Sequence, residues 1–168
     1  MLTDKETASN PKIRQSSNLA AEYYVASILF RLGYVVTVTF GNTKEIDLIV
    51  HDPQTHDTVT VDVKGLKNTT NWVMPKNPCQ RPDHFYILVT FKNKFGDLDS
   101  VPEVYTLPSE EVTKLWVPWV RKKSVAIPGV WKKDVMAIRW SDLRKRSDFK
   151  GMQGIKLLFQ KQKTVKPT

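Results

Sequence analysis

Two carboxylates and one ammonium group lie in two neighbouring segments that alternate polar and apolar residues. Asp47 lies in segment 45–51, and Asp62 and Lys64 lie in segment 58–64. A period of two is typical of β-strands that pack one face on a core, so the three side chains are expected together on the opposite face. Adjacent carboxylates can hold a divalent cation, and a lysine beside them can orient water or stabilise negative charge. The pattern therefore indicates metal-assisted chemistry on a phosphate.

The two segments form a predicted hairpin, because residues 52–57 between them have a turn composition. A turn centred between Gln54 and Thr55 pairs residues whose numbers sum to 109, which brings Asp47 opposite Asp62. Opposed like charges disfavour a sheet by about 0.2–1 kcal/mol, so a compensating cation such as Mg²⁺ is expected there. On the other face this register pairs Ile46 with Val63, Leu48 with Val61 and Val50 with Val59.

A third acid is expected from a helix over Asn18–Leu32, a segment rich in Ala, Leu and Tyr. Ser17 or Asn18 can cap the first free amides of this helix. Glu22 is the only charged residue in its interior, and at about 100° per residue the polar Ser27 lies far around the helix from it. Glu22 is therefore expected to face the body of the protein, where a carboxylate needs a partner.

These residues together resemble the PD-(D/E)xK phosphodiesterase superfamily, which has the restriction-endonuclease-like fold. The match covers residues 15–91 and consists of Glu22 on the opening helix, Ile46-Asp47 on one strand and Asp62-Val63-Lys64 on the next. Ile46 stands where the motif has proline. The resemblance implies one or two bound Mg²⁺ ions, with Mn²⁺ as a substitute. It also implies the roles of the residues: Glu22 as auxiliary metal ligand, Asp47 and Asp62 as principal ligands, the carbonyl of Val63 as a further ligand, and Lys64 as the catalytic cation beside the attacking water.

Simpler explanations of these side chains stay open. Taken singly, Asp47 and Asp62 can be solvent-facing strand acids. Lys64 can form a cross-strand salt bridge with Glu45, its facing residue in the predicted register. The segment after the motif can flank a phosphate, or it can be an ordinary loop with one packed tryptophan; it contains Lys67, Asn68 and Trp72.

The chain has a formal net charge of +9, and the surplus lies entirely in its second half. Residues 1–84 hold nine bases and nine acids, whereas residues 85–168 hold seventeen bases and eight acids. A clustered basic surface gains affinity for polyanions by displacing counterions, so nucleic acid, and DNA first, is the expected partner rather than a membrane. Trp119 and Trp140 lie among these bases, as on surfaces that stack on nucleobases, although they can equally be core residues. The candidate nucleic-acid-binding residues are Lys67, Arg121, Lys122, Lys123, Lys132, Lys133, Arg144, Lys145 and Arg146.

The expected fold class is α/β, with a restriction-endonuclease-like mixed central β-sheet of about five strands flanked by helices. Residues 1–15 are expected to form a flexible N-terminal arm, 16–159 a single nuclease-like domain with a basic C-terminal half, and 160–168 a frayed basic tail. A second helix, beginning at Pro108, is expected on another side of the sheet. The expected strands cover residues 34–40, 45–51, 58–64, 84–91, 103–107 and 135–140, of which 84–91 is apolar enough for a central strand.

These patterns predict a Mg²⁺-dependent nuclease, in the first place a DNA endonuclease. Junction resolvases, restriction, homing and repair enzymes all stay open, and a homodimer is the simplest arrangement for cutting both strands of a duplex. The alternatives are a catalytically inactive nucleic-acid-binding module of the same fold and a protein-interaction domain. The single Cys79 excludes an internal disulfide and a thiolate zinc cluster. Residues 1–15 lack the pattern of a secretion signal, and the apolar stretch 23–30 is too short to span a bilayer, so a cytoplasmic location is expected.

Overall fold

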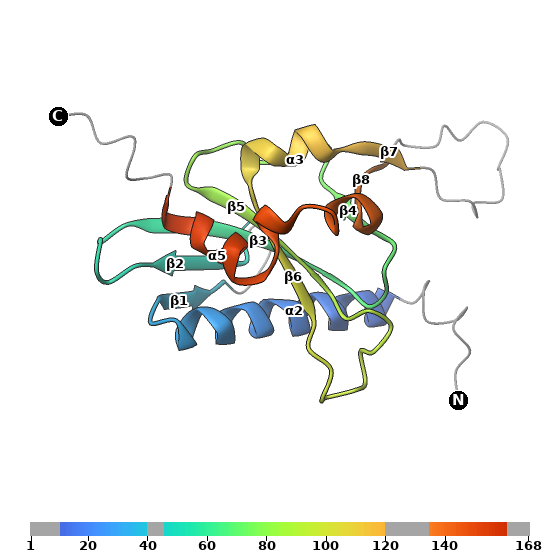
Figure 1. The fold of residues 1–168 in the computed structure, drawn as a ribbon, viewed down its shortest axis with the longest axis horizontal. Helices are drawn as coiled ribbons and strands as arrows, with labels where there is room; N and C mark the ends of the chain where they lie inside the picture. Colours follow the sequence, from blue (N-terminus) through green and yellow to red (C-terminus); the bar gives the residue numbers. More distant parts are fainter. Residues whose placement is uncertain (1–10, 40–45, 120–134, 161–168) are drawn as a thin grey trace, which may run out of the picture.

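The computed structural model describes residues 11–39, 46–119 and 135–160. Within these residues, five strands form one mixed sheet: β1 (Val35–Val38), β2 (Leu48–His51), β3 (Thr58–Leu66), β5 (His84–Thr90) and β6 (Glu103–Pro108). Their order in the sheet is β1-β2-β3-β5-β6, with β3 and β5 parallel and the other neighbours antiparallel (Figure 1). The predicted mixed sheet of about five strands is confirmed.

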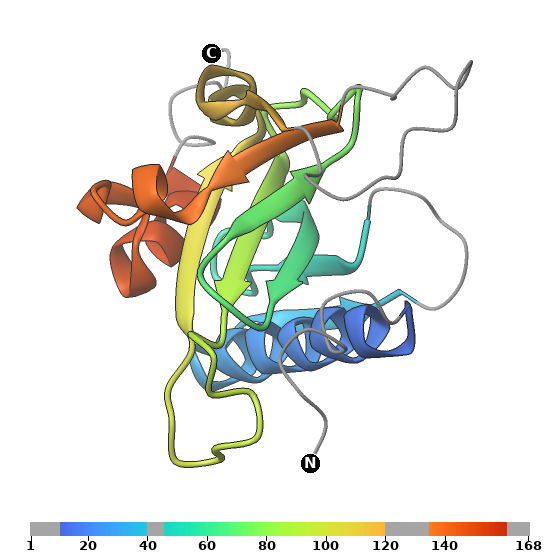
Figure 2. The same ribbon diagram turned by 90° about the vertical axis from the view of Figure 1, so that its right-hand side faces the viewer.

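Helices cover both faces of this sheet (Figures 1 and 2). The long helix α2 (Pro11–Arg31) lies across one face and packs most closely on β3. The short helix α3 (Ser109–Leu115) packs against β5 and β6 in a separate core on the opposite face. The predicted α/β class, with helices on different sides of the sheet, is therefore confirmed.

The register of β2 and β3 is the predicted one. Leu48 pairs with Val61 and Val50 with Val59, and all four side chains are fully buried in the core beneath α2. Since successive strand residues point to opposite faces, Asp62 projects from the face turned away from α2. The register predicted from the turn position therefore assigned the apolar and charged side chains of β3 to the correct faces.

The helix α2 begins at Pro11, before the predicted start at Asn18. Proline is favoured in the first turn of a helix, because its φ is already helical and its missing N–H would have no partner there. Ser17 and Asn18 thus lie inside the helix and do not cap it. The boundary predicted at residue 15 between arm and domain also falls inside the helix, while residues 1–10 and 161–168 lie outside the described residues.

The segment after β3 contains a strand where a loop was predicted. β4 (Asn71–Met74) pairs with β8 (Val135–Arg139), the strand predicted over 135–140, and β8 pairs with β7 (Val117–Trp119). Trp72 is 2% exposed, and its indole N–H donates to the carbonyl of Val89 at 3.1 Å. Trp72 is therefore the packed tryptophan of the simpler explanation and is held in the core between two sheets.

A C-terminal helix, α5 (Gly151–Gln160), was not predicted. Its Ile155, Leu158 and Phe159 are buried in the same core as α2, and Phe159 stacks on Tyr34 with ring centroids 4.9 Å apart. Apolar residues three and four positions apart were the available sequence signal, which the surrounding basic composition obscured. α5 packs along β6, and its last turn reaches the residue that precedes β1.

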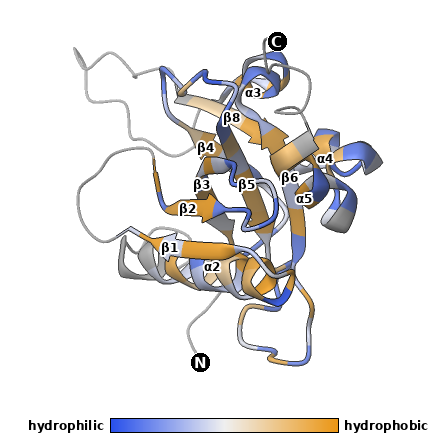
Figure 3. Ribbon diagram, turned by 90° about the vertical axis from the view of Figure 1, so that its left-hand side faces the viewer, coloured by the Kyte–Doolittle hydropathy of each residue, from blue (hydrophilic) through white to orange (hydrophobic). Residues whose placement is uncertain are grey.

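β5 is the central strand that its apolar composition predicted. All seven of its residues are buried, and its ribbon is hydrophobic along most of its length (Figure 3). In the part of the chain that the structure describes, no helix has the length and apolar character needed to cross a membrane.

Candidate active site

Asp47 lies at the free edge of β3, by which we mean residues 62–66, the part of the strand that extends past β2. Within the described residues, β2 pairs with β3 only as far as Val61. The N–H of Asp47 donates to the carbonyl of Val61 at 2.8 Å, and its carboxylate Oδ2 accepts the N–H of Val63 at 2.7 Å. The Asp47 carboxylate thus accepts a β3 amide that a neighbouring strand would otherwise bind. Asp47 therefore lies beside Asp62 at the strand edge and is not paired with it in a regular β-ladder.

Asp62 and Lys64 project from β3 on the face away from α2. Asp62 is 2% exposed, and the Lys64 ammonium forms a hydrogen-bonded ion pair with its Oδ1. Burial raises the pKa of Asp62; the Lys64 ammonium opposes that rise, and the neighbouring Asp47 carboxylate adds to it. Lys64 therefore pairs within its own strand. The alternative partner, Glu45, lies outside the described residues.

Glu22 approaches this group of charges from α2. Its side chain is only partly exposed, as predicted from its place on the helix. The pKa of Glu22 is raised to about 7. Burial is the largest cause, Asp47 adds to the rise, Lys64 opposes it, and Asp62 adds a smaller rise. Three carboxylates and one ammonium thus lie within electrostatic range of one another at the free edge of β3.

Replacing Glu22 by glutamine should stabilise the protein at about pH 8 and have little effect at about pH 4.5. The folded-state pKa of about 7 exceeds the ordinary 4.5, so the folded state holds this proton more tightly than the unfolded chain does. The resulting stability is complete below about pH 4.5 and is lost as the pH rises through about 7. After discounting for solvent around a half-buried group, we expect a gain of about 1–2 kcal/mol at the higher pH, measured by urea unfolding.

The control for Glu22→Gln is Asp57→Asn, which changes a partly exposed acid in the turn between β2 and β3. Its effect on the free energy of unfolding should be nearly the same at both pH values. Equal pH dependence of the Glu22→Gln variant and the unmodified protein would contradict the assignment of Glu22 to the buried charge cluster.

Asn18 belongs to this site, although the sequence pattern indicated a helix cap. Its Oδ1 accepts the N–H of Gly65 at 2.9 Å. Two side chains, Asp47 and Asn18, therefore satisfy successive outward-facing amides of the free edge, those of Val63 and Gly65. No local signal could reveal this role, because the two residues are 47 positions apart in the chain.

Replacing Asn18 by alanine should lower the free energy of unfolding by about 1–2 kcal/mol, because the Gly65 amide loses its acceptor in a partly buried setting. Urea unfolding measures the loss, and hydrogen exchange at the Gly65 amide should become faster. Asn77→Ala, at an exposed position, is the control and should stay within about 0.5 kcal/mol. An unchanged exchange rate at Gly65 would contradict the prediction.

Gly65 also sets how closely α2 approaches the site. A Cβ at this position would overlap the Ser17 carbonyl oxygen and lie 3.0 Å from the Cβ of Ala21. Only glycine allows the helix backbone to come so near to β3. This close approach is what brings Glu22, one residue beyond Ala21, to the strand edge.

The predicted nucleic-acid-binding bases lie in different places. Lys67 follows the end of β3, and its ammonium lies 4.2 Å from the centroid of the Phe95 ring.

The basic run 144–146 follows α4 (Trp140–Leu143), whose Trp140 donates its indole N–H to Glu103 on β6 at 3.2 Å. The backbone N–H of Trp140 also donates to the carbonyl of Thr70, in the segment between β3 and β4, at 3.0 Å. The individual residues are Arg144, which stacks on Trp140, the exposed Lys145, and Arg146, which stacks on Phe149 and pairs with Asp148 at 2.7 Å. The remaining predicted bases, Arg121, Lys122, Lys123, Lys132 and Lys133, lie outside the described residues, as does the side chain of Trp119.

The donor chemistry of the site suits a hard divalent cation. Carboxylate oxygens are the ligands that Mg²⁺ prefers, and it commonly takes one or two of them together with waters. The carbonyl of Val63 points to the same edge as its N–H, toward Asp47, because both groups of one strand residue lie on one side. As the side chains stand, no three His, Cys, Asp or Glu residues in the described ranges form a group that could share one ion. Asp47 and Asp62 are therefore the two carboxylates at this edge whose donor chemistry fits such a cation.

Comparison with known proteins gives one structural likeness. No protein-family model matches the chain, and no curated protein matches it. Among solved structures, the chain is similar to the bacterial homing endonuclease I-Ssp6803I, with a TM-score of 0.52 and 14% sequence identity over 92% of this chain and 98% of that chain. At this identity the likeness concerns the fold, so the chain has an α/β fold that a nuclease also uses.

Proposed function

We propose that this protein is a metal-dependent endonuclease that hydrolyses phosphodiester bonds of nucleic acid, with DNA as the substrate, by a PD-(D/E)xK mechanism. The observation that carries the proposal is the meeting of Glu22, Asp47, Asp62 and Lys64 at the free edge of β3. Three acids from three separate segments have no structural need to converge, since their mutual repulsion costs stability. The fold shared with a homing endonuclease supports the same function.

Each residue has a defined part in this proposal. Asp47 and Asp62 hold Mg²⁺, for which Mn²⁺ can substitute, and Glu22 and the Val63 carbonyl are auxiliary donors. A bound divalent ion supplies a lowered pKa for the attacking water and neutralises charge on the phosphate. Lys64 keeps an ammonium beside Asp62, where it orients the water or stabilises the extra negative charge of the transition state.

The charge distribution supports a polyanionic substrate. The chain carries +9, and Lys67 lies just beyond the strand that bears Asp62 and Lys64. Binding should weaken steeply as salt rises, because each neutralised phosphate releases counterions. A linear fall of the logarithm of affinity with the logarithm of salt concentration is the expected signature.

The test of the proposal is incubation of the purified protein with circular, linear, branched and single-stranded DNA, and with RNA, each with Mg²⁺, with Mn²⁺ and with a chelator. Cleavage of at least one DNA substrate in the presence of the ions, and none with the chelator, is expected. Undiminished cleavage with the chelator would overturn the metal-dependent mechanism, and no cleavage of any substrate would overturn the assignment as a nuclease.

A second candidate function is a non-catalytic nucleic-acid-binding module of the same fold. The observation that favours it is the Lys64–Asp62 ion pair, which neutralises the most buried carboxylate without any metal ion. Calorimetry with Mg²⁺ and Mn²⁺ distinguishes the two functions. Salt-sensitive DNA binding without ion binding supports the module, whereas ion binding that is lost in Asp62→Asn supports the nuclease.

A further inference from the structure

The loop between β5 and β6, residues 92–102, presents an exposed leucine between two acids. Leu98 is 96% exposed, and its neighbours are Asp97 and Asp99. Figures 1 and 2 show this loop projecting past α2, away from the body of the protein. Single exposed apolar residues are common on protein surfaces, but a leucine at the tip of a projecting loop is presented for contact.

The loop is held in shape by its own hydrogen bonds. The N–H of Asp97 donates to the carbonyl of Lys94 at 3.0 Å, and the N–H of Ser100 donates to the carbonyl of Asp97 at 3.2 Å. The rings of Phe91 and Phe95 pack edge to face at its base, 4.8 Å apart. A loop ordered in this way loses little conformational entropy when its tip is bound.

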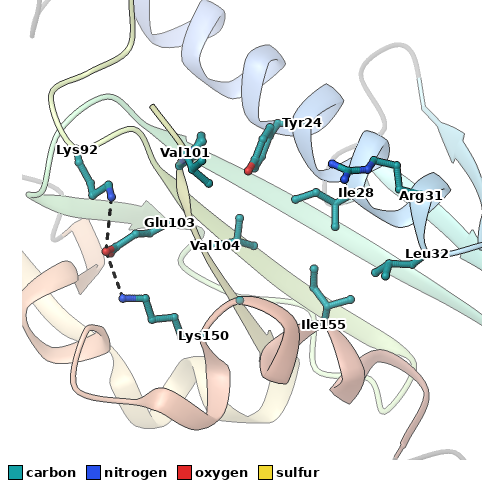
Figure 4. Close-up of a pocket in the computed structure, with 12 residues that line it drawn as sticks. Tyr24, Ile28, Arg31, Leu32, Lys92, Val101, Glu103, Val104, Lys150 and Ile155 are labelled. Atoms are coloured by element: carbon teal, nitrogen blue, oxygen red, sulfur yellow. Dashed lines mark hydrogen bonds and ion pairs between the residues drawn. The ribbon is translucent and has the colours of Figure 1, made fainter. Parts of the chain in front are cut away.

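A cavity of about 530 Å³ opens between α2, β6 and α5, on the α2 side of the sheet (Figure 4). Both ends of the same loop line it, through Lys92 at one end and Val101 and Pro102 at the other. Its volume lies in the range of sites that enclose small ligands or a short peptide segment. Its apolar lining comes mainly from Tyr24, Ile28, Leu32, Val104 and Ile155.

The charged residues at this cavity are mostly basic. Lys92 and Lys150 both lie near the carboxylate of Glu103, at 3.9 Å and 3.2 Å. Arg31, which also lines the cavity, makes no ion pair within the described residues. Three bases and one acid leave an excess of two positive charges around an apolar centre. The loop tip presents an apolar side chain between two acids. Asp97 lies 3.9 Å from the Lys94 ammonium, whereas Asp99 makes no ion pair within the described residues. Asp99 and Arg31 are therefore the complementary charges.

We propose that the loop tip of one copy of this chain, Asp97–Leu98–Asp99, docks into this cavity of a second copy. The loop tip projects away from the body of the protein, so it does not enter the cavity that its own ends line. A two-fold axis near the opening of the cavity would let each copy insert its Leu98 into the cavity of the other, so that both cavities are occupied in one dimer. Two chains of net charge +9 repel each other, so Asp99 of one copy facing Arg31 of the other supplies the attraction that orients them. This inference does not rest on the nuclease function, because it concerns the opposite face of the sheet from Asp62 and Lys64.

Sedimentation velocity of the full chain without substrate tests the proposal, over about 1–100 µM at low and high salt. The unmodified protein should form dimers that dissociate as salt rises. Leu98→Ser should raise the dimer dissociation constant at least about 30-fold, as loss of a central anchor does. Ile49→Ser is the matched control, because Ile49 is a partly exposed residue on the opposite face of the sheet, and it should leave dimerisation unchanged.

Charge reversal provides the second arm. Arg31→Glu alone should weaken the dimer by about tenfold, and adding Asp99→Lys to it should restore most of the affinity. Circular dichroism checks that each variant folds. A protein that stays monomeric throughout the concentration range, or a dimer that Leu98→Ser and Arg31→Glu leave intact, would overturn the proposal. Neither outcome bears on cleavage, which is measured separately with nucleic acid.

Discussion

Asp62→Asn and Lys64→Ala should each reduce cleavage of nucleic acid by about 10²–10⁴-fold, while the affinity for the same substrate changes little. Asp62 is the most buried carboxylate of the charge cluster and carries the ion pair with Lys64, so each substitution removes a charge from the reacting centre. Substrate affinity comes mainly from many phosphate contacts spread over a basic surface, and one residue contributes little to it. Single-turnover cleavage and fluorescence anisotropy of labelled DNA measure the two quantities separately.

Two matched controls accompany these variants. Asp57→Asn changes an acid in the turn between β2 and β3, and Lys76→Ala changes an exposed lysine after β4. Both should leave cleavage within about twofold, because surface substitutions away from the reacting groups have small effects. Full activity of either Asp62→Asn or Lys64→Ala would remove that residue from the mechanism. Equal loss of cleavage and affinity would point to unfolding, which circular dichroism detects.

The Gly65→Ala substitution should both destabilise the protein and impair cleavage. A methyl group here meets the carbonyl group of Ser17, with its carbon 2.6 Å away, so α2 must move off β3. Overpacking of this kind costs about 1–3 kcal/mol, and more when backbone has to shift. Moving the helix also separates Asn18 and Glu22 from the strand edge, and displacement of a catalytic group by about 1 Å can reduce a rate about 10²-fold.

Gly96→Ala is the control for this effect. A Cβ at Gly96 has no atom within 4 Å, so stability and cleavage should both stay close to those of the unmodified protein. Urea unfolding and single-turnover cleavage provide the two readouts. A Gly65→Ala variant with unchanged stability would show that α2 can move away from β3 without cost, contrary to the close packing described above.

The elements near the hairpin were the most predictable from the sequence. Alternation in β2 and β3 and the turn composition between them predicted the pairing of Leu48 with Val61, because these contacts are local in the chain. The apolar run of β5 predicted a central strand. The strand β4 and the helix α5 were missed, since β4 has only four residues and α5 is stabilised by its packing on β6 and Tyr34 rather than by its own composition.

The candidate site was predictable in its membership and less so in its geometry. Glu22, Asp47, Asp62 and Lys64 stood out by type and spacing, and the structure brings them within electrostatic range. The sequence pattern predicts Asn18 as a helix cap. Its observed role is different, because its side chain accepts the N–H of Gly65, 47 residues away in the chain. The basic run 144–146 was predicted from composition as part of a nucleic-acid-binding surface, and the structure places it after Trp140, whose indole N–H donates to Glu103 on β6.

The order of residues along the chain by itself determined which side chains of β3 share a face, because strand geometry assigns alternate residues to opposite sides wherever pairing is local. Only the tertiary structure decided that β2 begins at Leu48, that the Asp47 and Asn18 side chains accept the outward-facing amides of β3, and that a glycine lets α2 bring a third acid to this edge. These features depend on contacts between distant segments, whose energies are set by how whole elements pack and not by any local pattern.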